Sequence, residues 1–190
     1  YALSGSGNGE VKLWEVETGN VLATLTGHTG PVYGVCYLPD GRTAVSVSHD
    51  GSLRVWDLAG KRSTEPIESG GARRVACRAD GKVLATTGDA GAVHLRQPDS
   101  GRVLRSLDAH AGRVTDLRFL PGGKVLATVG TDGMLRLWDT EEGTPMASLA
   151  SLEGEGEYAT WTSEGLYVGS ESAPHMVSVC LGLAAYPLHP

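Results

Sequence analysis

Apolar and polar residues alternate along several short stretches of this chain, and turn residues separate the stretches. Val32–Tyr37 alternates and is followed by Pro39-Asp40-Gly41, Thr43–Ser48 is followed by the turn Asp50-Gly51, and Leu53–Trp56 comes next. Alternation of this kind predicts a half-buried strand, and Asp-Gly between two such stretches predicts a hairpin, whose backbone needs the positive φ that Gly and Asp tolerate. No longer stretch has a helical period, so we expect almost no helix.

These stretches recur along the chain at a nearly constant interval. The turn glycines mark it with spacings of 42, 40 and 42 residues: Gly9, Gly51, Gly91 and Gly133. Three copies also share a tryptophan at the same interval: Trp14, Trp56 and Trp138. Outer strands are expected at Val21–Leu25, Val103–Leu107 and Met146–Leu149. Four short strands in a unit of about 40 residues is the pattern of a propeller blade.

The repeat predicts an all-β chain built of four-stranded antiparallel blades. We divide residues 1–190, as a single propeller segment, into a partial blade (1–25), a blade (26–65), a degenerate blade (66–107), a blade (108–149) and a degenerate terminal blade (150–190). The first blade begins at its second strand, so about four and three-quarter blades are expected, an incomplete ring taken from a larger propeller. Its open strand edges could pair with the remaining blades or with another chain.

The motifs at these positions resemble WD40 repeats. Gly27-His28 is followed by LRVWD, from Leu53 to Asp57, and LRLWD recurs from Leu135 to Asp139. The stretch Ala159–Ser170 is similar to the closing repeats of bacterial WD40 proteins. The resemblance covers essentially the whole chain and implies a WD40-type propeller of bacterial type, as a C-terminal portion.

Other copies depart from the WD40 pattern. In the fourth blade Ala109-His110 keeps the histidine without its glycine. In the third, Ile67-Glu68 stands opposite Gly-His, Ala90 replaces the turn Asp, and Arg96-Gln97 replaces Trp-Asp. The third blade is therefore expected to be degenerate.

A serine, a histidine and an acid within one repeat could suggest a catalytic triad. The intervals between these residues recur in a second blade, however, and a single active site has no reason to be duplicated at the blade period. The resemblance implies instead two buried hydrogen-bond sets: His28, Ser46, Asp50 and Trp56, and His110, Thr128, Asp132 and Trp138. We expect these sets to be structural and the chain to have no catalytic residues.

A different group of positions varies in chemistry from blade to blade. The first positions of the expected innermost strands are Tyr33, Arg73, Thr115 and Glu157, and the residues before the turn Asp are His49, Asp89 and Thr131. They are expected to ring one mouth of the central channel. Because an aromatic, a cation, a hydroxyl and an anion share one register, these positions are candidates for binding a protein partner. Tyr33 and Arg73 are the strongest, since aromatic and Arg side chains dominate hot spots.

Composition and cysteine spacing argue against several classes of protein. The net charge of −6, from 16 basic and 22 acidic residues, argues against a nucleic-acid-binding module. The cysteines Cys36, Cys77 and Cys180 lie 41 and 103 residues apart. This spacing argues against a disulfide framework and a zinc ribbon, and favours a reducing, cytoplasmic location. The chain shows no metal, cofactor or membrane-spanning pattern.

The function expected from these observations is a non-enzymatic scaffold that binds a protein partner. The alternative is that the propeller is a sensor or regulatory region of a longer bacterial signalling or effector enzyme, with its catalytic domain upstream. Fold alone does not decide between them.

Overall fold

The structure is a computed structural model that describes residues 1–151, 158–163, 167–169, 178–181 and 184–187. The strands in it pair antiparallel. The described residues contain no α-helix, and one short 3-10 turn, η1 (Asp89–Gly91), lies between two strands. The all-β class predicted from the alternating pattern is therefore confirmed.

Three sheets follow one another from the N-terminus. The first has the order β1 (Ala2–Gly5), β2 (Val11–Trp14) and β3 (Val21–Leu25). The second runs β4 (Val32–Tyr37), β5 (Thr43–Ser48) and β6 (Ser52–Asp57), with β7 (Arg62–Ser63) and β8 (Ile67–Glu68) both paired to β6. The third contains β9 (Val75–Cys77), β10 (Leu84–Thr87), β11 (Ala92–Arg96) and β12 (Val103–Asp108).

The fourth sheet is longer than the others. Its strands are β13 (Val114–Phe119), β14 (Val125–Gly130), β15 (Met134–Asp139), β16 (Pro145–Ser151), β17 (Tyr158–Thr162) and β18 (Tyr167–Gly169). A separate hairpin consists of β19 (Ser178–Leu181) and β20 (Ala184–Pro187). The predicted fifth blade, residues 150–190, would place β17 as its innermost strand, whereas β17 pairs instead with β16. The outer edge of β16 offers unpaired backbone groups, and β17 satisfies them. The blade boundaries themselves stay predictions.

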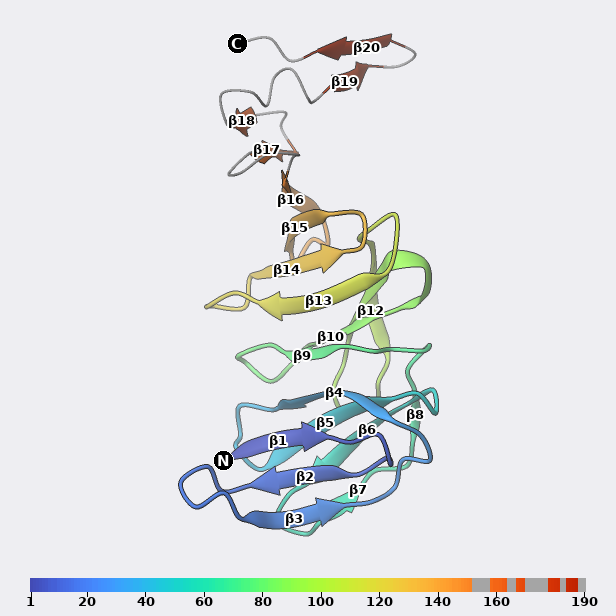
Figure 1. The fold of residues 1–190 in the computed structure, drawn as a ribbon, viewed down its shortest axis with the longest axis vertical. Coiled ribbons are helices and arrows are strands. Elements are labelled where there is room, and N and C mark those ends of the chain that lie inside the picture. Colours follow the sequence, from blue (N-terminus) through green and yellow to red (C-terminus); the bar gives the residue numbers. More distant parts are fainter. Residues whose placement is uncertain (152–157, 164–166, 170–177, 182–183, 188–190) are drawn as a thin grey trace.

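The sheets are arranged as successive blades that do not close into a ring. They follow one another along the long axis of the molecule, with the N-terminus near one end and β19 and β20 at the other (Figure 1). The first strands of three successive sheets, β4, β9 and β13, contact one another in that order. This open series of blades is the incomplete propeller that the repeat predicts.

The hairpin turns of the second blade (β5–β6) and the fourth blade (β14–β15) differ in one respect from the prediction. Gly51 has a φ of 84°, and Gly133 one of 77°, whereas the preceding Asp50 and Asp132 have no positive φ. The Gly51 N–H donates to the Ser48 carbonyl at 3.2 Å, which closes a four-residue turn that ends in glycine. Only the glycine therefore needs the left-handed conformation, and the aspartate is free for hydrogen bonding.

A proline explains why the second blade has a broken outer strand. Pro66 separates β7 from β8, and a proline has no N–H to donate to a sheet. The Thr64 N–H still donates to the Val55 carbonyl at 2.8 Å, so the segment stays against β6. The outer edge of this blade is thus shorter and less regular than that of β3 or β12.

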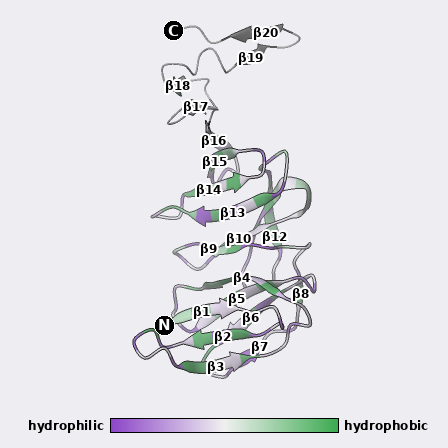
Figure 2. Ribbon diagram, viewed as in Figure 1, coloured by the Kyte–Doolittle hydropathy of each residue, from purple (hydrophilic) through white to green (hydrophobic). Residues whose placement is uncertain are grey.

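The hydrophobic core is divided among the junctions between blades, and Figure 2 shows the hydrophobic residues gathered on the strands. Alternation along a strand directs neighbouring residues to opposite junctions: Ala44 belongs to the cluster shared with the first sheet, and Val45 to the cluster shared with the third. The three clusters are centred on Val11, Leu25 and Trp56; on Val47, Leu53 and Leu84; and on Leu95, Leu126 and Trp138. Each fully buried aliphatic side chain contributes about 1.5–3 kcal/mol.

Cys36 and Cys77 form a disulfide between neighbouring blades. Cys36 is in β4 and Cys77 in β9, with their Cα atoms 6.2 Å apart. The expectation of no disulfide framework is wrong for this pair. The spacing of 41 residues is close to one blade period, and one period brings two residues onto adjacent inner strands. The predicted cytoplasmic location rested partly on that expectation and stays a prediction.

Candidate functional site

Four polar side chains of the second blade form one hydrogen-bonded chain below the β5–β6 turn. The Trp56 Nε1–H donates to Ser46 Oγ at 2.8 Å, and this oxygen lies 2.7 Å from His28 Nε2. The other ring nitrogen, Nδ1, lies 2.9 Å from Asp50 Oδ2. Because the ionised carboxylate can only accept, His28 carries its proton on Nδ1 and Ser46 donates to Nε2. Every donor in the chain then has an acceptor.

Burial and hydrogen bonding keep this chain in one protonation state. The His28 side chain is 0% exposed and that of Asp50 is 11% exposed. Burial works to raise the pKa of Asp50, but hydrogen bonds from Ser52 and Thr29 outweigh it and hold the pKa far below its ordinary value. Burial lowers the pKa of His28, against the opposing influence of Asp50. The histidine is therefore held neutral and the aspartate ionised.

The same chain recurs in the fourth blade. His110 Nδ1 lies 2.8 Å from Asp132 Oδ1, and Nε2 lies 2.9 Å from Thr128 Oγ1, to which Trp138 Nε1 donates at 3.0 Å. Burial works to raise the pKa of Asp132, but hydrogen bonds, the one from Arg136 foremost, hold it far below its ordinary value. The structure thus brings together the members of both predicted sets.

These two sets have no access to a substrate. Ser46 is 0% exposed and Thr128 is 1% exposed, and each hydroxyl already contacts both a histidine and a tryptophan. A nucleophile must lie within reach of the atom that it attacks. The geometry instead ties the hairpin turn to the two strands below it, which is a structural role.

In the third blade an arginine occupies the tryptophan position. Arg96 Nε donates to Thr86 Oγ1 at 3.1 Å, the hydroxyl position held by Ser46 and Thr128 in the other blades. Its terminal nitrogens donate to the carbonyls of Glu68 at 3.3 Å, Ser69 at 3.0 Å and Gly101 at 3.0 Å. Arg96 is 6% exposed, and these carbonyl dipoles solvate the buried guanidinium. The degenerate blade keeps the same tie with different chemistry.

Ser69, rather than Glu68, makes the backbone hydrogen bond that the histidine makes in the fourth blade. The Ser69 N–H donates to the carbonyl of the turn residue Gly51 at 2.8 Å, just as the His110 N–H donates to that of Gly91 at 3.0 Å. The sequence register, which sets Ile67-Glu68 opposite Gly-His, is therefore wrong by one residue at this point.

Tyr33, His49 and Arg73, three of the predicted binding residues, lie together where the inner strands begin. The rings of Tyr33 and His49 meet edge to face with their centroids 5.8 Å apart. The Arg73 guanidinium lies over the Tyr33 ring, 4.7 Å from its centroid. His49 and Arg73 are exposed, and Tyr33 is half-buried. Two blades therefore contribute to one accessible cluster.

Bulges in the inner strands bring Tyr33 and Thr115 to the same place. The pairing register shifts at Tyr33 in β4 and at Thr115 in β13. A bulged residue is left out of the hydrogen-bond ladder, and its side chain is turned relative to its neighbours. Tyr33 and Thr115 both line a hollow of about 270 Å³, together with Arg73, Arg74, Arg113 and Val114. This hollow is called the arginine hollow below.

The remaining candidate positions lie around this region or outside the described residues. Thr131 is exposed, and its N–H donates to the Arg113 carbonyl at 2.9 Å. Asp89 begins η1, and the next residue, Ala90, lines a second hollow of about 260 Å³ together with Arg113. Glu157 lies outside the described residues.

Arg74 and Arg113 are candidate residues that the sequence reasoning missed. Arg74 adjoins Arg73, which the sequence predicts as a binding residue, and this pair alone is too small for a nucleic-acid footprint. Arg113 lies 40 residues after Arg73, about one blade period away, and both arginines precede an inner strand. A basic pair followed by a cation one period later is the signal that could have found the cluster.

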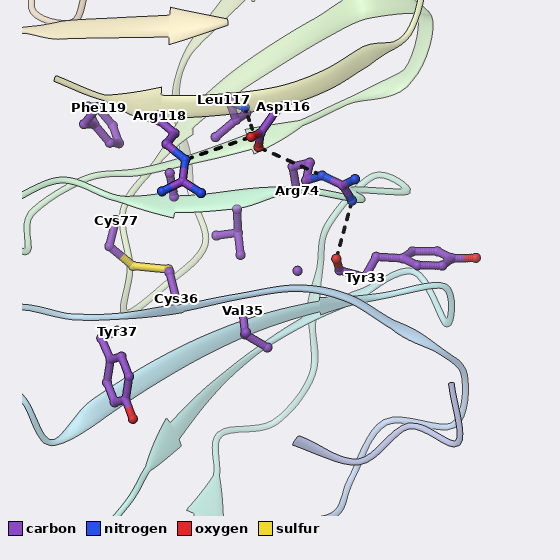
Figure 3. A pocket seen from close by; sticks show the side chains of 13 residues that line it. Tyr33, Val35, Cys36, Tyr37, Arg74, Cys77, Asp116, Leu117, Arg118 and Phe119 are labelled. Carbon is purple, nitrogen blue, oxygen red and sulfur yellow. Dashed lines mark hydrogen bonds and ion pairs between the residues drawn. A yellow bond between two sulfur atoms is a disulfide. The ribbon is translucent and has the colours of Figure 1, made fainter. Parts of the chain in front are cut away.

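A larger hollow of about 510 Å³ continues from this cluster along β4, β9 and β13 (Figure 3). The Cys36–Cys77 disulfide forms part of its wall. Figure 3 shows the Asp116 carboxylate between two arginines, 4.0 Å from Arg74 Nε and 3.9 Å from Arg118 Nε. The inner strands of three neighbouring blades therefore line one continuous surface.

Comparison with known proteins now identifies the repeat. The family described as "WD domain, G-beta repeat" matches residues 19–57 and 101–139. Each match starts ahead of an outer strand, β3 or β12, and ends at the Trp-Asp of the next blade. The chain contains WD40 repeats. WD40 repeats are protein–protein interaction modules, and the predicted WD40 propeller fold is confirmed.

Several WD40 proteins share sequence with this chain. WD repeat and SOCS box-containing protein 1 of Danio rerio is 38% identical over 100 residues, 50% of this chain and 24% of that protein. Periodic tryptophan protein 2 of Saccharomyces cerevisiae is 31% identical over 118 residues, 59% of this chain and 13% of that protein. Lissencephaly-1 homolog 1 of Paramecium tetraurelia is 42% identical over 60 residues, 32% of this chain and 15% of that protein. The WD40 chain thus spans about a quarter or less of these relatives.

These WD40 relatives are eukaryotic, so they lend no support to a bacterial origin, which stays a prediction. The alternative function, a regulatory region of a longer bacterial enzyme, also stays a prediction. Among the described residues, no helix has the length and apolar character needed to cross a membrane. That part of the chain also holds no group of three or more His, Cys, Asp and Glu residues placed to bind a metal ion.

Proposed function

We propose that this WD40 chain is a non-enzymatic scaffold that binds a protein partner at the mouth where its inner strands begin. The observation that carries the proposal is the Tyr33–His49–Arg73 cluster. Aromatic and arginine side chains are the types that contribute most to protein interfaces, and here they are already packed against each other at an accessible surface. A partner would therefore meet a surface that loses little side-chain freedom on binding.

The buried polar sets support a scaffold over a hydrolase. Each hydroxyl that could act as a nucleophile is enclosed, and its proton is directed to a histidine within a repeated structural unit. A scaffold needs rigidity in these places, and a fully satisfied polar network supplies it.

Capture of partners by the purified chain tests the proposal. Tyr33→Ala and Arg73→Ala alter the mouth, whereas Thr24→Ala alters an exposed position on the outer strand β3 and serves as the control. We expect a protein that is cross-linked to the native chain to be lost from both mouth variants and kept by Thr24→Ala. Loss with Thr24→Ala alone would place the partner on the outer rim and overturn the proposal.

A further inference from the structure

The arginine hollow concentrates positive charge on an acidic chain. Arg73, Arg74 and Arg113 line it with Tyr33, Val114 and Thr115, and no carboxylate is among these lining residues. The chain as a whole carries a net charge of −6. Three guanidinium groups gathered here are therefore not explained by overall composition.

Arg73 is held in place by contacts that leave its charge available. Its guanidinium lies over the Tyr33 ring at 4.7 Å, a cation–π contact that does not consume its N–H donors. The backbone at Arg73 and Arg74 is also held in place, because both N–H groups donate to the Thr87 hydroxyl, at 2.8 and 3.1 Å. Thr87 is 3% exposed, so this anchor belongs to the core of the blade.

The other two arginines are only weakly neutralised. Arg74 donates to the carbonyls of Tyr33 at 3.5 Å and Arg73 at 3.1 Å, and its ion pair with Asp116 is long, at 4.0 Å, with about half of each side chain exposed. An exposed ion pair of this kind contributes little to stability. For Arg73 and Arg113, the described residues supply no carboxylate within ion-pair distance.

The space beside the arginines suits an extended backbone. The second hollow, of about 260 Å³, adjoins the first because both include Arg73, Arg113 and Val114. Much of its remaining lining is glycine or alanine: Gly71, Gly88, Ala90 and Gly112. Small residues leave room for a peptide to pass next to the charged groups.

We propose that the arginine hollow binds an anionic side chain on an extended segment of the partner, an inference that rests on the proposed function. The planar guanidinium matches the two oxygens of a carboxylate or a phosphoryl group, and several arginines around one hollow can share such a group. A carboxylate of an acidic peptide and a phosphorylated side chain offer this same chemistry. The acidic character of the whole chain opposes a long nucleic-acid partner.

Fluorescence anisotropy with labelled short peptides tests this inference on the full chain. The probes are a peptide rich in glutamate, the same peptide with glutamine in place of glutamate, and a version with phosphoserine; single-stranded DNA is the fourth probe. We expect binding of the glutamate or phosphoserine peptide, weakened by added salt, and none of the glutamine peptide. The stronger of the two anionic peptides identifies the source of the group.

The double variant Arg73→Gln/Arg113→Gln tests the site, and Arg105→Gln, which removes a positive charge from the exposed outer strand β12, is its control. Removing charge-assisted hydrogen bonds should weaken binding of the anionic peptide by about tenfold or more, while the control keeps it. Unchanged thermal unfolding of the double variant shows that it is folded. Equal weakening by Arg105→Gln, equal binding of the glutamine peptide, or stronger arginine-dependent binding of DNA would each overturn the inference. Loss of partner capture with Tyr33→Ala but no binding of either anionic peptide would overturn this inference alone and leave the scaffold proposal standing.

Discussion

Replacing Arg96 by alanine should destabilise the third blade strongly, because its guanidinium is the shared donor for several buried acceptors. The change removes hydrogen bonds to Thr86 Oγ1 and to the carbonyls of Glu68, Ser69 and Gly101. Arg96 is 6% exposed, so these acceptors meet little water after the change. Burial also lowers the pKa of the guanidinium, because a charge is costly to bury.

The magnitude follows from these opposing effects. Leaving a buried acceptor without a donor costs about 1–3 kcal/mol, and the bonds to Thr86, Gly101 and Ser69 are buried. Removing the charge regains part of its desolvation cost, which is several kcal/mol for a buried ion. We therefore expect Arg96→Ala to lower the free energy of unfolding by about 3 kcal/mol. Arg96→Met, which keeps an apolar stem, should cost about 2 kcal/mol.

Urea unfolding followed by tryptophan fluorescence measures these losses, with Arg105→Ala as an exposed control on β12 that should change stability by less than about 0.5 kcal/mol. If Arg96→Ala proves no more destabilising than Arg105→Ala, the arginine does not replace the tryptophan as a tie between strands. If Arg96→Met is more stable than the native chain, the desolvation cost outweighs the hydrogen bonds.

Three further predictions concern the polar sets and the disulfide. Asp50→Ala and Asp132→Ala should each lower the free energy of unfolding by about 1–3 kcal/mol in denaturant titrations, since each leaves a buried histidine N–H without its carboxylate; clearly unequal losses would contradict equivalent roles. Stability should fall as the pH drops below about 6.5, because histidine in the unfolded chain binds a proton there and His28 in the folded chain does not. It should fall again below about pH 4, because carboxylates of the unfolded chain bind protons there while Asp50 and Asp132 stay ionised in the folded chain. Unfolding measured across pH should show both steps, and stability that is flat from pH 7 to 5 would refute the first. Reducing Cys36–Cys77 should lower stability by about 2–4 kcal/mol, because the bridge closes a loop of 41 residues; thermal unfolding with a reductant should reproduce the effect of Cys36→Ser, and a reductant that still shifts that variant would contradict this cause.

The features predictable from the sequence are those that every blade needs. Gly51 and Gly133 repeat because their hairpins require a positive φ at that position, and Trp56 and Trp138 repeat because each packs against the preceding blade. Residues with the same structural role in successive blades therefore repeat at the blade period within one sequence. The strands around Val32–Tyr37 were predictable for the same reason.

Features that join different blades were much harder to predict. The Cys36–Cys77 bridge and the gathering of Arg73 with Arg113 depend on which residues meet across a junction. Bulges displace the inner strands by one residue, and Ser69 shows the same one-residue shift in the third blade. A period counted along the chain cannot locate such shifts, because they are settled by hydrogen bonding between strands.

The division of the core into separate junction clusters bears on how such a chain can evolve. Each cluster is shared by two neighbouring blades only, so a duplicated blade brings its own junction and leaves the more distant ones unchanged. The packing lost through a substitution in one cluster is likewise confined to the two blades that share it. Such arrays can therefore lengthen, shorten or diversify one blade at a time during evolution. A degenerate blade such as the one that contains Arg96 can persist while its neighbours keep the WD40 residues.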